Sequence, residues 1–485
     1  MKKSIFKNII YKFSLNMFNL IVPIIIGTYV VRKLGPDLMG LINYSQAVFA
    51  YFFIFASFGV YQYGLREISK VRDRIENLES TFTSLFIITI VTNIITAIFY
   101  ILFANTQKNN TSMYMASIIL SFNLFSNIFY VEWVNEALES YDFITIKTII
   151  IRLINIILIL MIVKSSNDYS KYLILLGLTT FLNNIVSYIY VRRRIKLNFN
   201  NLEIKKHIRP MFLVVILSNA NVLYTQLDKV MLGRYNGTSE VAFYTMAQNI
   251  SYMINTALLT LIHVSIPRLG NYIANKEKEK YMELLNKISQ IYLMILFPAS
   301  IGMFLLSKEI VFIYGGSEYI SAFPILMVFS IYIITLGYEA ILSNQVMYVN
   351  GREKEQVKIL LLFGVVNAVF NFIVLKLNMF NGVTSLITTV FSNMMVVITQ
   401  HYYIKRELKI QYNIFSLEKT KYLLIAMIFI PITYVIRLLF SNMILTIILI
   451  ILVNSGVYFS ILLLLKDKLI YDLIYQLKEK IKYKI

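Results

Sequence analysis

The sequence predicts an all-α integral membrane protein with about fourteen transmembrane helices, in two six-helix bundles related by pseudo-two-fold symmetry plus two extra C-terminal helices. Hydrophobic residues make up 58% of the 485 residues and charged residues 15%, against about 25% charged in soluble domains. About fourteen apolar stretches exceed or approach the ~20 residues that cross a bilayer. Lys and Arg gather in alternate connections between these stretches, which is typical of a polytopic membrane protein.

The apolar stretches give the expected spans in chain order. Assigned from a cytoplasmic N-terminus, about 35 of the 46 Lys and Arg residues lie inside and about 9 outside. Charges close to the end of a span are counted with the adjoining connection, and the remaining two, Arg152 and Lys229, lie deeper within spans. This bias predicts that both termini are cytoplasmic. The expected spans are 9–31, 41–63, 80–103, 113–134, 143–163, 171–191, 211–232, 241–265, 285–306, 322–347, 357–377, 383–403, 421–440 and 443–465.

Two related halves are expected. Segments 32–49 and 232–250 both pass from a short Gly-containing turn into a helix, and Tyr44 and Ala47 match Tyr244 and Ala247. Six spans per half is an even number, so a duplication would give parallel repeats about an axis along the membrane normal. The basic connection 192–210 is either a hinge between moving bundles or a loop that sets topology. The expected parts are an N-terminal bundle (1–195), a cytoplasmic linker (196–210), a C-terminal bundle (211–405), and two additional helices with a basic cytoplasmic tail (406–485).

Composition argues against several functional classes. The formal charge of +20 comes from basic residues in short loops and in the tail, where they meet anionic lipid headgroups, so nucleic-acid binding is not expected. The chain has no cysteine and three scattered histidines, and it carries no nucleotide-binding loop or catalytic triad, so we expect no metal, no cofactor and no enzymatic activity. The longest outer connection, 307–321, has about fifteen residues, which disfavours a polymerase or ligase.

Charged side chains at bilayer depth cost about 2.5–3.5 kcal/mol each on insertion scales, so they face a partner or a wet cavity. Glu132, Glu136 and Glu139 are spaced to share one helix face. Arg152 lies roughly 13 Å into the fifth span, level with Glu132 if the fourth and fifth spans form a hairpin. A Glu132–Arg152 ion pair is therefore possible. Such a pair is either purely structural, with each charge neutralising the other, or it holds the Arg152 guanidinium in position to bind a diphosphate.

Three further charges lie in spans. Asp228 and Lys229 are neighbours near the outer end of the seventh span, where they are either interfacial or functional. Glu339, in the tenth span, is a candidate for proton or sodium coupling, or has a structural role. Amide side chains are also frequent in the spans, where they either join helices or meet sugar hydroxyls. The amides that we select as candidate sugar contacts are Asn16, Asn19, Gln226 and Gln248.

Four segments resemble a known family. They are RKLGPDLMGLINYSQA (32–47), QLDKVMLGRYNGTSEVAFYTMAQNI (226–250), IVFIYGGSEYISAFPIL (310–326) and VNGREKEQ (349–356). Together they resemble the oligosaccharide repeat-unit flippases, the O-antigen and capsule exporters of the MATE-like multidrug/oligosaccharidyl-lipid/polysaccharide superfamily. The resemblance spans nearly the whole chain. It implies two bundles around a central cavity, alternating access, and a bacterial plasma (inner) membrane location.

The resemblance also implies a substrate, an undecaprenyl-diphosphate-linked oligosaccharide moved to the outer leaflet for capsule or other surface polysaccharide, with polymerase machinery as a further partner. The family's seventh-span acidic-basic pair falls on Asp228 and Lys229, whereas Arg32, Arg66 and Arg152 are proposed as substrate contacts on physical grounds alone. The arginine-dense first two spans of lipid II flippases are missing, which argues against a peptidoglycan role. One rival is a cation-coupled multidrug antiporter, in which Glu132, Asp228 and Glu339 would be the acids. The other is the polymerase or ligase.

Overall fold

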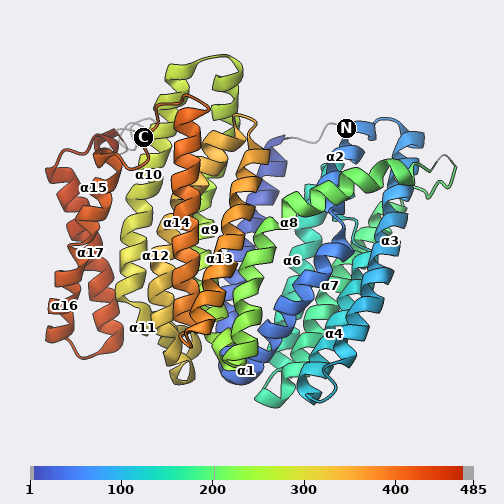
Figure 1. The fold of residues 1–485 in the computed structure, drawn as a ribbon, viewed down its shortest axis with the longest axis horizontal. Coiled ribbons are helices and arrows are strands. Elements are labelled where there is room, and N and C mark those ends of the chain that lie inside the picture. The colour runs from blue at the N-terminus through green and yellow to red at the C-terminus, as the bar shows by residue number, and fades with distance from the viewer. Residues whose placement is uncertain (1–4, 201, 473–485) are drawn as a thin grey trace, which may run out of the picture. The chain divides into compact units, whose positions relative to one another are not determined.

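The computed structural model describes residues 5–200 and 202–472, and it is helical throughout this part of the chain, with no strand (Figure 1). Twelve helices among the described residues are long and apolar enough to cross a membrane. This confirms the predicted all-α membrane fold. The number of fourteen spans and the pseudo-two-fold relation stay predictions. The chain forms two compact units, Met1–Thr245 and Met246–Ile485.

The first unit contains eight α-helices and the start of a ninth. Gly35 interrupts α1 with φ 73° and ψ 171°, a conformation that glycine adopts at no steric cost, so α1 consists of two helical segments that cover the first expected span and most of the second. The bounds are α1 (Ile5–Ser57), α2 (Val60–Val71), α3 (Ile75–Asn105), α4 (Thr111–Ile128), α5 (Glu132–Ala137), α6 (Tyr141–Ile162), the 3₁₀ turn η1 (Ser166–Asp168), α7 (Tyr169–Arg192) and α8 (Ile204–Tyr235).

Two apolar clusters hold this unit together. One joins α2, α3, α5 and the first half of α8, and it surrounds Trp133, which is 1% exposed and packs against Gly64. The other joins α1, α3, α4, α6 and α7 around Ile42, Tyr100 and Leu124. Dense interdigitation of this kind fixes the positions of the polar groups that lie between the helices.

The connection from α7 to α8 is fastened to α3. Because its backbone N–H groups find side-chain acceptors there, this stretch belongs structurally to the first unit and is not a free tether. The three bonds run from Lys196 N to Glu79 Oε1 (3.0 Å), from Asn198 N to Thr83 Oγ1 (2.9 Å) and from Glu203 N to Ser84 Oγ (3.1 Å).

The second unit contains most of α9 and the helices that follow it. The C-terminal helices α15 and α16 lie against α10, and the Tyr458 hydroxyl of α17 donates to the Met294 carbonyl of α10 (2.8 Å). Arg437 of α16 forms an ion pair with Glu309 of α11 (2.6 Å). The bounds are α9 (Thr238–Ala274), α10 (Lys278–Leu305), α11 (Ser307–Gly315), the 3₁₀ turn η2 (Ser317–Ala322), α12 (Phe323–Ala340), the π-helical η3 (Ile341–Tyr348), α13 (Glu353–Lys376), α14 (Gly382–Arg406), α15 (Leu417–Ala426), α16 (Phe429–Leu439) and α17 (Met443–Leu464).

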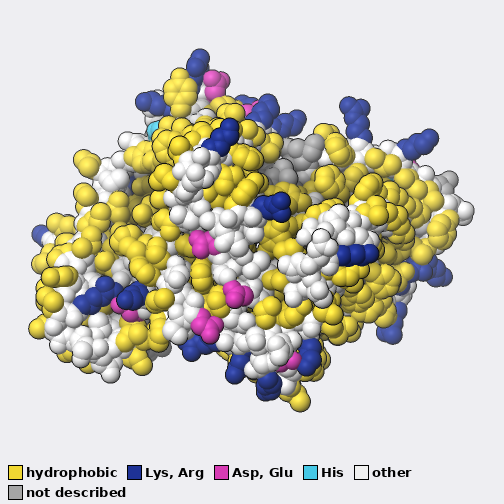
Figure 2. Space-filling model, turned by 60° about the horizontal axis from the view of Figure 1, so that its bottom comes forward, with side chains coloured by type: hydrophobic (Ala, Val, Ile, Leu, Met, Phe, Trp, Pro, Cys, Tyr) yellow, Lys and Arg dark blue, Asp and Glu magenta, His cyan; other side chains and the backbone are white. Residues whose placement is uncertain are grey.

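Many large apolar side chains point outward. Figure 2 shows broad areas of hydrophobic side chains, with Lys and Arg side chains scattered at the edges of the view and between these areas. Ile98, Phe99 and Leu102 of α3, for example, are 56%, 61% and 58% exposed. Exposure on this scale fits a surface that faces lipid.

Candidate functional site

The two segments that we compared as repeats, 32–49 and 232–250, make direct contact in the first unit. The Ser239 hydroxyl donates a hydrogen bond to Asp37, and a Cβ on Gly40 would lie 1.8 Å from the Thr238 carbonyl oxygen. One helical turn along α1, the ring of Tyr44 occupies the space where a Cβ on Gly233 would be. Both glycines therefore permit an approach that any side chain would prevent.

Asp228 and Lys229 lie on α8, five and four residues before Gly233. Asp228 is 1% exposed and accepts a hydrogen bond from the Tyr244 hydroxyl of α9 (2.9 Å), while Lys229 is 9% exposed. Both side chains are therefore enclosed by neighbouring helices, and the two interpretations of the pair, interfacial or functional, stay predictions. Gln226 is half-buried on α8, two residues before Asp228. The role of these three residues in substrate binding stays a prediction.

The predicted ion pair between Glu132 and Arg152 is wrong, because the partner of Glu132 is Lys147. Lys147 Nζ lies 3.0 Å from both oxygens of the Glu132 carboxylate and 2.7 Å from Ser187 Oγ, and that hydroxyl donates to Glu132 Oε2 (2.6 Å). Asn135 Nδ2 adds a contact of 3.3 Å. Burial of a carboxylate and an ammonium is tolerated here because each finds charge and hydrogen-bond partners.

The prediction that Glu132, Glu136 and Glu139 share one helix face is wrong for Glu139, whereas Glu132 and Glu136 lie four residues apart on α5. The backbone leaves helical geometry between α4 and α5, and Glu139 follows the end of α5 with φ 54°. Glu136 accepts from the Tyr61 hydroxyl (3.1 Å to each oxygen), and Glu139 forms an ion pair with Arg72 (2.9 Å). The three carboxylates thus have different partners on different elements.

The proposed arginines are dispersed within the first unit. Arg66 of α2 donates from Nε to Glu67 (3.0 Å) and lies 5.2 Å from the centre of the Tyr63 ring. Arg152 is half-buried on α6, and Arg32 is exposed on α1 three residues before Gly35. Each arginine lies on a different helix, and their role as substrate contacts stays a prediction.

A ladder of amides and hydroxyls crosses the interior of the first unit. Asn127 of α4 donates to Asn93 of α3 (3.1 Å), which donates to the Ala56 carbonyl (3.1 Å), and Asn184 of α7 donates to Ser126 (3.0 Å). These contacts join helices, as expected for polar residues in a membrane bundle. Our four amide candidates did not include them.

Glu339 accepts a hydrogen bond from Asn393 of α14 (2.6 Å) in the second unit. The π-helical segment η3 begins two residues later, and Ser343 within it accepts from Gln400 (3.0 Å). Asn393 Oδ1 and Gln400 Oε1 are buried and have no hydrogen-bond partner among the described residues. Single π-helical turns frequently occur at functional sites, which supports Glu339 as a candidate functional carboxylate.

The remaining amide candidates have different outcomes. Gln248 of α9 is buried in the second unit. The side chains of Asn16 and Asn19 lie outside the described residues. The structure places Lys147, Ser187 and Tyr244 at the buried charges. Lys147 and Ser187 were not singled out from the sequence, and Tyr244 was noted only as the counterpart of Tyr44. Lys147 offered a signal, as a lysine inside the apolar run FITIKTIII (143–151).

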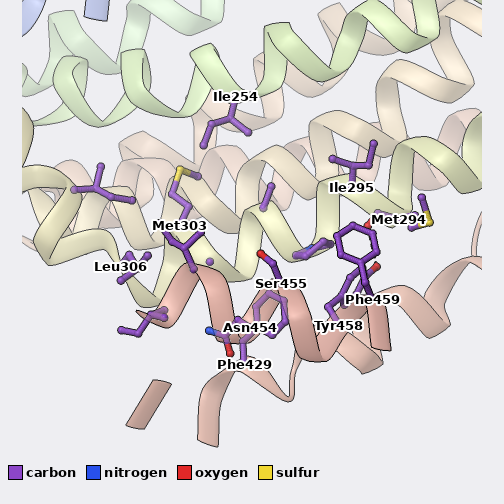
Figure 3. A pocket seen from close by; sticks show the side chains of 16 residues that line it. Ile254, Met294, Ile295, Met303, Leu306, Phe429, Asn454, Ser455, Tyr458 and Phe459 are labelled. Carbon is purple, nitrogen blue, oxygen red and sulfur yellow. Dashed lines mark hydrogen bonds between the residues drawn. The ribbon is translucent and has the colours of Figure 1, made fainter. Parts of the chain in front are cut away.

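An apolar groove of about 430 Å³ lies in the second unit between α10 and the hairpin of α16 and α17 (Figure 3). Met294, Ile295 and Met303 of α10 line one wall, while Tyr458 and Phe459 of α17 line the other. No charged side chain lines the groove among the described residues. Its chemistry suits hydrocarbon and not a diphosphate.

Comparison with known proteins identifies the family. A family model described as polysaccharide biosynthesis protein matches residues 5–273, which is more than half of the chain. The chain belongs to the polysaccharide biosynthesis protein family. A relative named as an O-antigen transporter of Escherichia coli (strain K12) is 24% identical over 388 residues, covering 76% of this chain and 90% of the relative. A protein of the same name from Shigella dysenteriae is 23% identical, covering 76% and 92%.

Solved structures show how this member of the family folds. The lipid II flippase MurJ, in an inward closed conformation, superposes with a TM-score of 0.67 at 16% identity, covering 94% of this chain and all of MurJ. An inward-facing multidrug resistance MATE transporter of the MOP superfamily gives a TM-score of 0.63 at 13% identity, covering 81% and 94%. At these identities the likeness shows the fold and does not separate the two substrate classes.

Proposed function

We propose that the chain translocates polyprenyl-diphosphate-linked oligosaccharide repeat units from the cytoplasmic to the outer leaflet of a bacterial plasma membrane, for capsule or other surface polysaccharide. The observation that carries this proposal is the family match, together with relatives named as O-antigen transporters that are covered over nine-tenths of their length. Translocation without covalent chemistry also agrees with transporters and flippases as relatives and structural neighbours.

The chemistry of the substrate suggests which side chains contact each of its parts. The diphosphate needs cationic donors, for which Arg32, Arg66, Arg152 and Lys229 are the candidates, because guanidinium and ammonium groups bind phosphate oxygens strongly. Sugar hydroxyls need amides, with Asn16, Asn19, Gln226 and Gln248 as candidates. The polyprenyl chain stays in lipid. Both chain termini are cytoplasmic in this proposal, and a polysaccharide polymerase acts next on the product.

Ion coupling belongs to the same proposal. Glu339 and Asp228 are the carboxylates to test, because each is embedded among helices and each accepts a hydrogen bond from a neutral neighbour. Glu132 is instead neutralised by Lys147, so we assign it the part of a charge partner. An isoelectronic Glu339→Gln variant that transports without dependence on the ion gradient would identify Glu339 as the coupling group.

Cells that lack the chain provide the decisive experiment. Their lipids are extracted, polyprenyl-diphosphate oligosaccharides are identified by mass spectrometry, and the leaflet is assigned by probe accessibility in intact cells. Single repeat units trapped on the cytoplasmic side are the expected result. Units that reach the outer face unpolymerised would indicate a polymerase. Absence of accumulation, with loss of cationic dye efflux, would indicate the multidrug antiporter.

Arg152 is tested in the complemented strain. Arg152→Ala is expected to reduce export while the protein stays inserted and folded. Arg268→Ala serves as the matched control, because Arg268 is an exposed arginine bonded to Tyr272 of its own helix. Undiminished export by the Arg152 variant would remove this residue from the substrate path.

A further inference from the structure

A polar cavity of about 670 Å³ lies in the first unit, and none of the buried charges described above lines it. Four segments form its walls: the end of α2, the first turns of α3, the α7–α8 connection and the start of α8. All four lie on the side of the membrane that the Lys/Arg bias places in the cytoplasm. Its volume is within the range of ligand sites. Polar residues of its lining include Glu67, Glu76, Asn77, Asn198, Glu203 and His207.

His207 makes this cavity more than a surface depression. The imidazole is 2% exposed, and its Nδ1 is hydrogen-bonded to the Tyr63 hydroxyl (2.8 Å). Its Nε2 is buried and has no hydrogen-bond partner among the described residues. A buried polar atom left unpaired costs free energy, so a ring held on one side and unpaired on the other indicates a missing partner.

The walls of the cavity are held in place. The three backbone bonds from the α7–α8 connection to α3 fix one wall against another, and the Asn200 N–H donates to Asn198 Oδ1 (2.9 Å) within that connection. A site whose groups are fixed before the ligand arrives loses less conformational entropy on binding.

The charges exclude the more obvious ligands. Glu67 is already bonded to Arg66 and Lys70, and Glu203 to Lys206, so the acidic groups are largely neutralised by neighbours. No cluster of acidic or histidine residues among those described could hold a metal ion. Lys206 is the one Lys or Arg among the described lining residues, and its ammonium is already paired with Glu203 (2.6 Å), so the cavity offers a diphosphate no uncompensated cation.

Once metal ions and a diphosphate are excluded, neutral hydroxyl groups are the ligand groups that fit the cavity. Carboxylates, amides, hydroxyls and an imidazole nitrogen together accept and donate hydrogen bonds in many directions, as a polyhydroxylated ligand requires. We propose that this cavity binds sugar residues of the repeat unit on the cytoplasmic side, before the diphosphate enters the translocation path. The inference rests on the proposed function and adds a glycan-binding site to it.

Native mass spectrometry of the purified protein tests the site with two probes. One is the lipid-linked repeat unit extracted from cells lacking the chain, and the other is undecaprenyl diphosphate, which has no sugar. The test variant combines Asn77→Ala and Thr81→Ala, two lining residues one turn apart on α3. Loss of their hydrogen bonds should weaken binding of the repeat unit about tenfold and leave undecaprenyl diphosphate unchanged. Asn105→Ala, at the other end of α3, is the matched control.

Other results overturn the glycan site. These are equal wild-type affinity for both probes, equal weakening of both by the variant, or no weakening of either. Hydrogen exchange gives an independent measurement, because the oligosaccharide released from the lipid should protect peptides 75–84 and 202–210 at saturation, and absent protection would contradict the proposal. Failure of the proposed function has a separate signature, the absence of trapped repeat units in cells lacking the chain.

Discussion

The Ser239 hydroxyl donates a hydrogen bond to the Asp37 carboxylate and so joins the start of α9 to α1 across 202 residues of sequence. Both residues lie in connections that the charge bias places outside the membrane. With Gly40 against Thr238, they bring these two expected outer turns together. An alternating-access cycle has to break this contact when it releases a substrate outward, because a large glycan could not pass the closed turns.

A disulfide between Asp37→Cys and Ser239→Cys should therefore stop export. The chain has no cysteine of its own, so the pair can be introduced without background. A disulfide needs Cβ atoms roughly 3.5–4.5 Å apart, and the backbones approach closely beside this pair, where a Cβ on Gly40 would lie 1.8 Å from the Thr238 carbonyl oxygen. We expect a rapid, reductant-reversible cross-link, seen by mass spectrometry, together with reversible loss of export.

The controls for this cross-link are the single variants Asp37→Cys and Ser239→Cys, neither of which can form the intramolecular disulfide because the chain has no other cysteine. Each should leave export intact under the same oxidising conditions. Full export with the 37–239 disulfide in place would mean that the contact stays closed throughout the cycle.

Gly40→Ala should prevent the same contact from closing. The new Cβ would meet the Thr238 carbonyl oxygen at 1.8 Å, and a backbone oxygen cannot move aside as a flexible side chain can. We expect several-fold less cross-linking of the 37–239 cysteine pair in this background. Gly456→Ala, where a Cβ meets nothing within 4 Å, is the matched control. Equal cross-linking in both backgrounds would show that the two cysteines meet without the close approach of Gly40 to Thr238.

The sequence predicted the helical membrane fold because apolar runs and charge bias are local properties. It did not predict the break between α4 and α5, since the residues around Phe129–Val131 continue an apolar run. The break between α4 and α5, together with the angular positions of Lys147 and Arg152 around α6, determines which residue pairs with Glu132. Lys147 and Arg152 are five residues apart, so they differ by about 140° around the helix and roughly 7.5 Å along it. Depth alone suggested Arg152, and only the packing of α5, α6 and α7 selects Lys147.

Other parts of the candidate site were predicted in part. Asp228 and Lys229 were recognised as a pair, but their burial against Tyr244 depends on how α8 and α9 pack, which spacing does not reveal. Glu339 was recognised as an intramembrane carboxylate, yet its partner Asn393 is 54 residues away. Long-range partners of this kind follow from tertiary structure, whereas the sequence marks only the residues that need one.

Lys147→Met should destabilise the protein strongly. Lys147 is 5% exposed and Glu132 17%, so removal of the ammonium leaves a carboxylate without its counter-charge among packed helices. Breaking one side of a buried pair costs about 3–5 kcal/mol. Thermal unfolding in detergent should show this loss, and the double variant Lys147→Met/Glu132→Gln should recover most of it. Recovered stability without recovered export would assign the pair a part in transport, whereas recovery of both would make it purely structural.

His207 should make the junction of α2 and α8 sensitive to acid. It lies on α8 before the expected seventh span and faces Tyr63, Lys206, Glu203 and Glu67. Burial, with help from Lys206, lowers its pKa below 6.5, and Glu203 and Glu67 oppose this only in part. The unfolded chain therefore takes up the proton first as the pH falls. The stabilisation is complete above about pH 6.5 and is lost as the pH drops from there towards the folded-state pKa.

The measurement is the melting temperature at about pH 7.5 and about pH 5.5, for the wild type and for His207→Asn. The asparagine retains a polar group but does not titrate in this range. The wild type should lose more stability on acidification than the variant, because only the wild type has the buried imidazole to protonate. After correction for the slower intrinsic exchange at the lower pH, the protection of peptide 202–210 should fall in the wild type alone. An equal loss in both proteins would place the acid-sensitive group elsewhere.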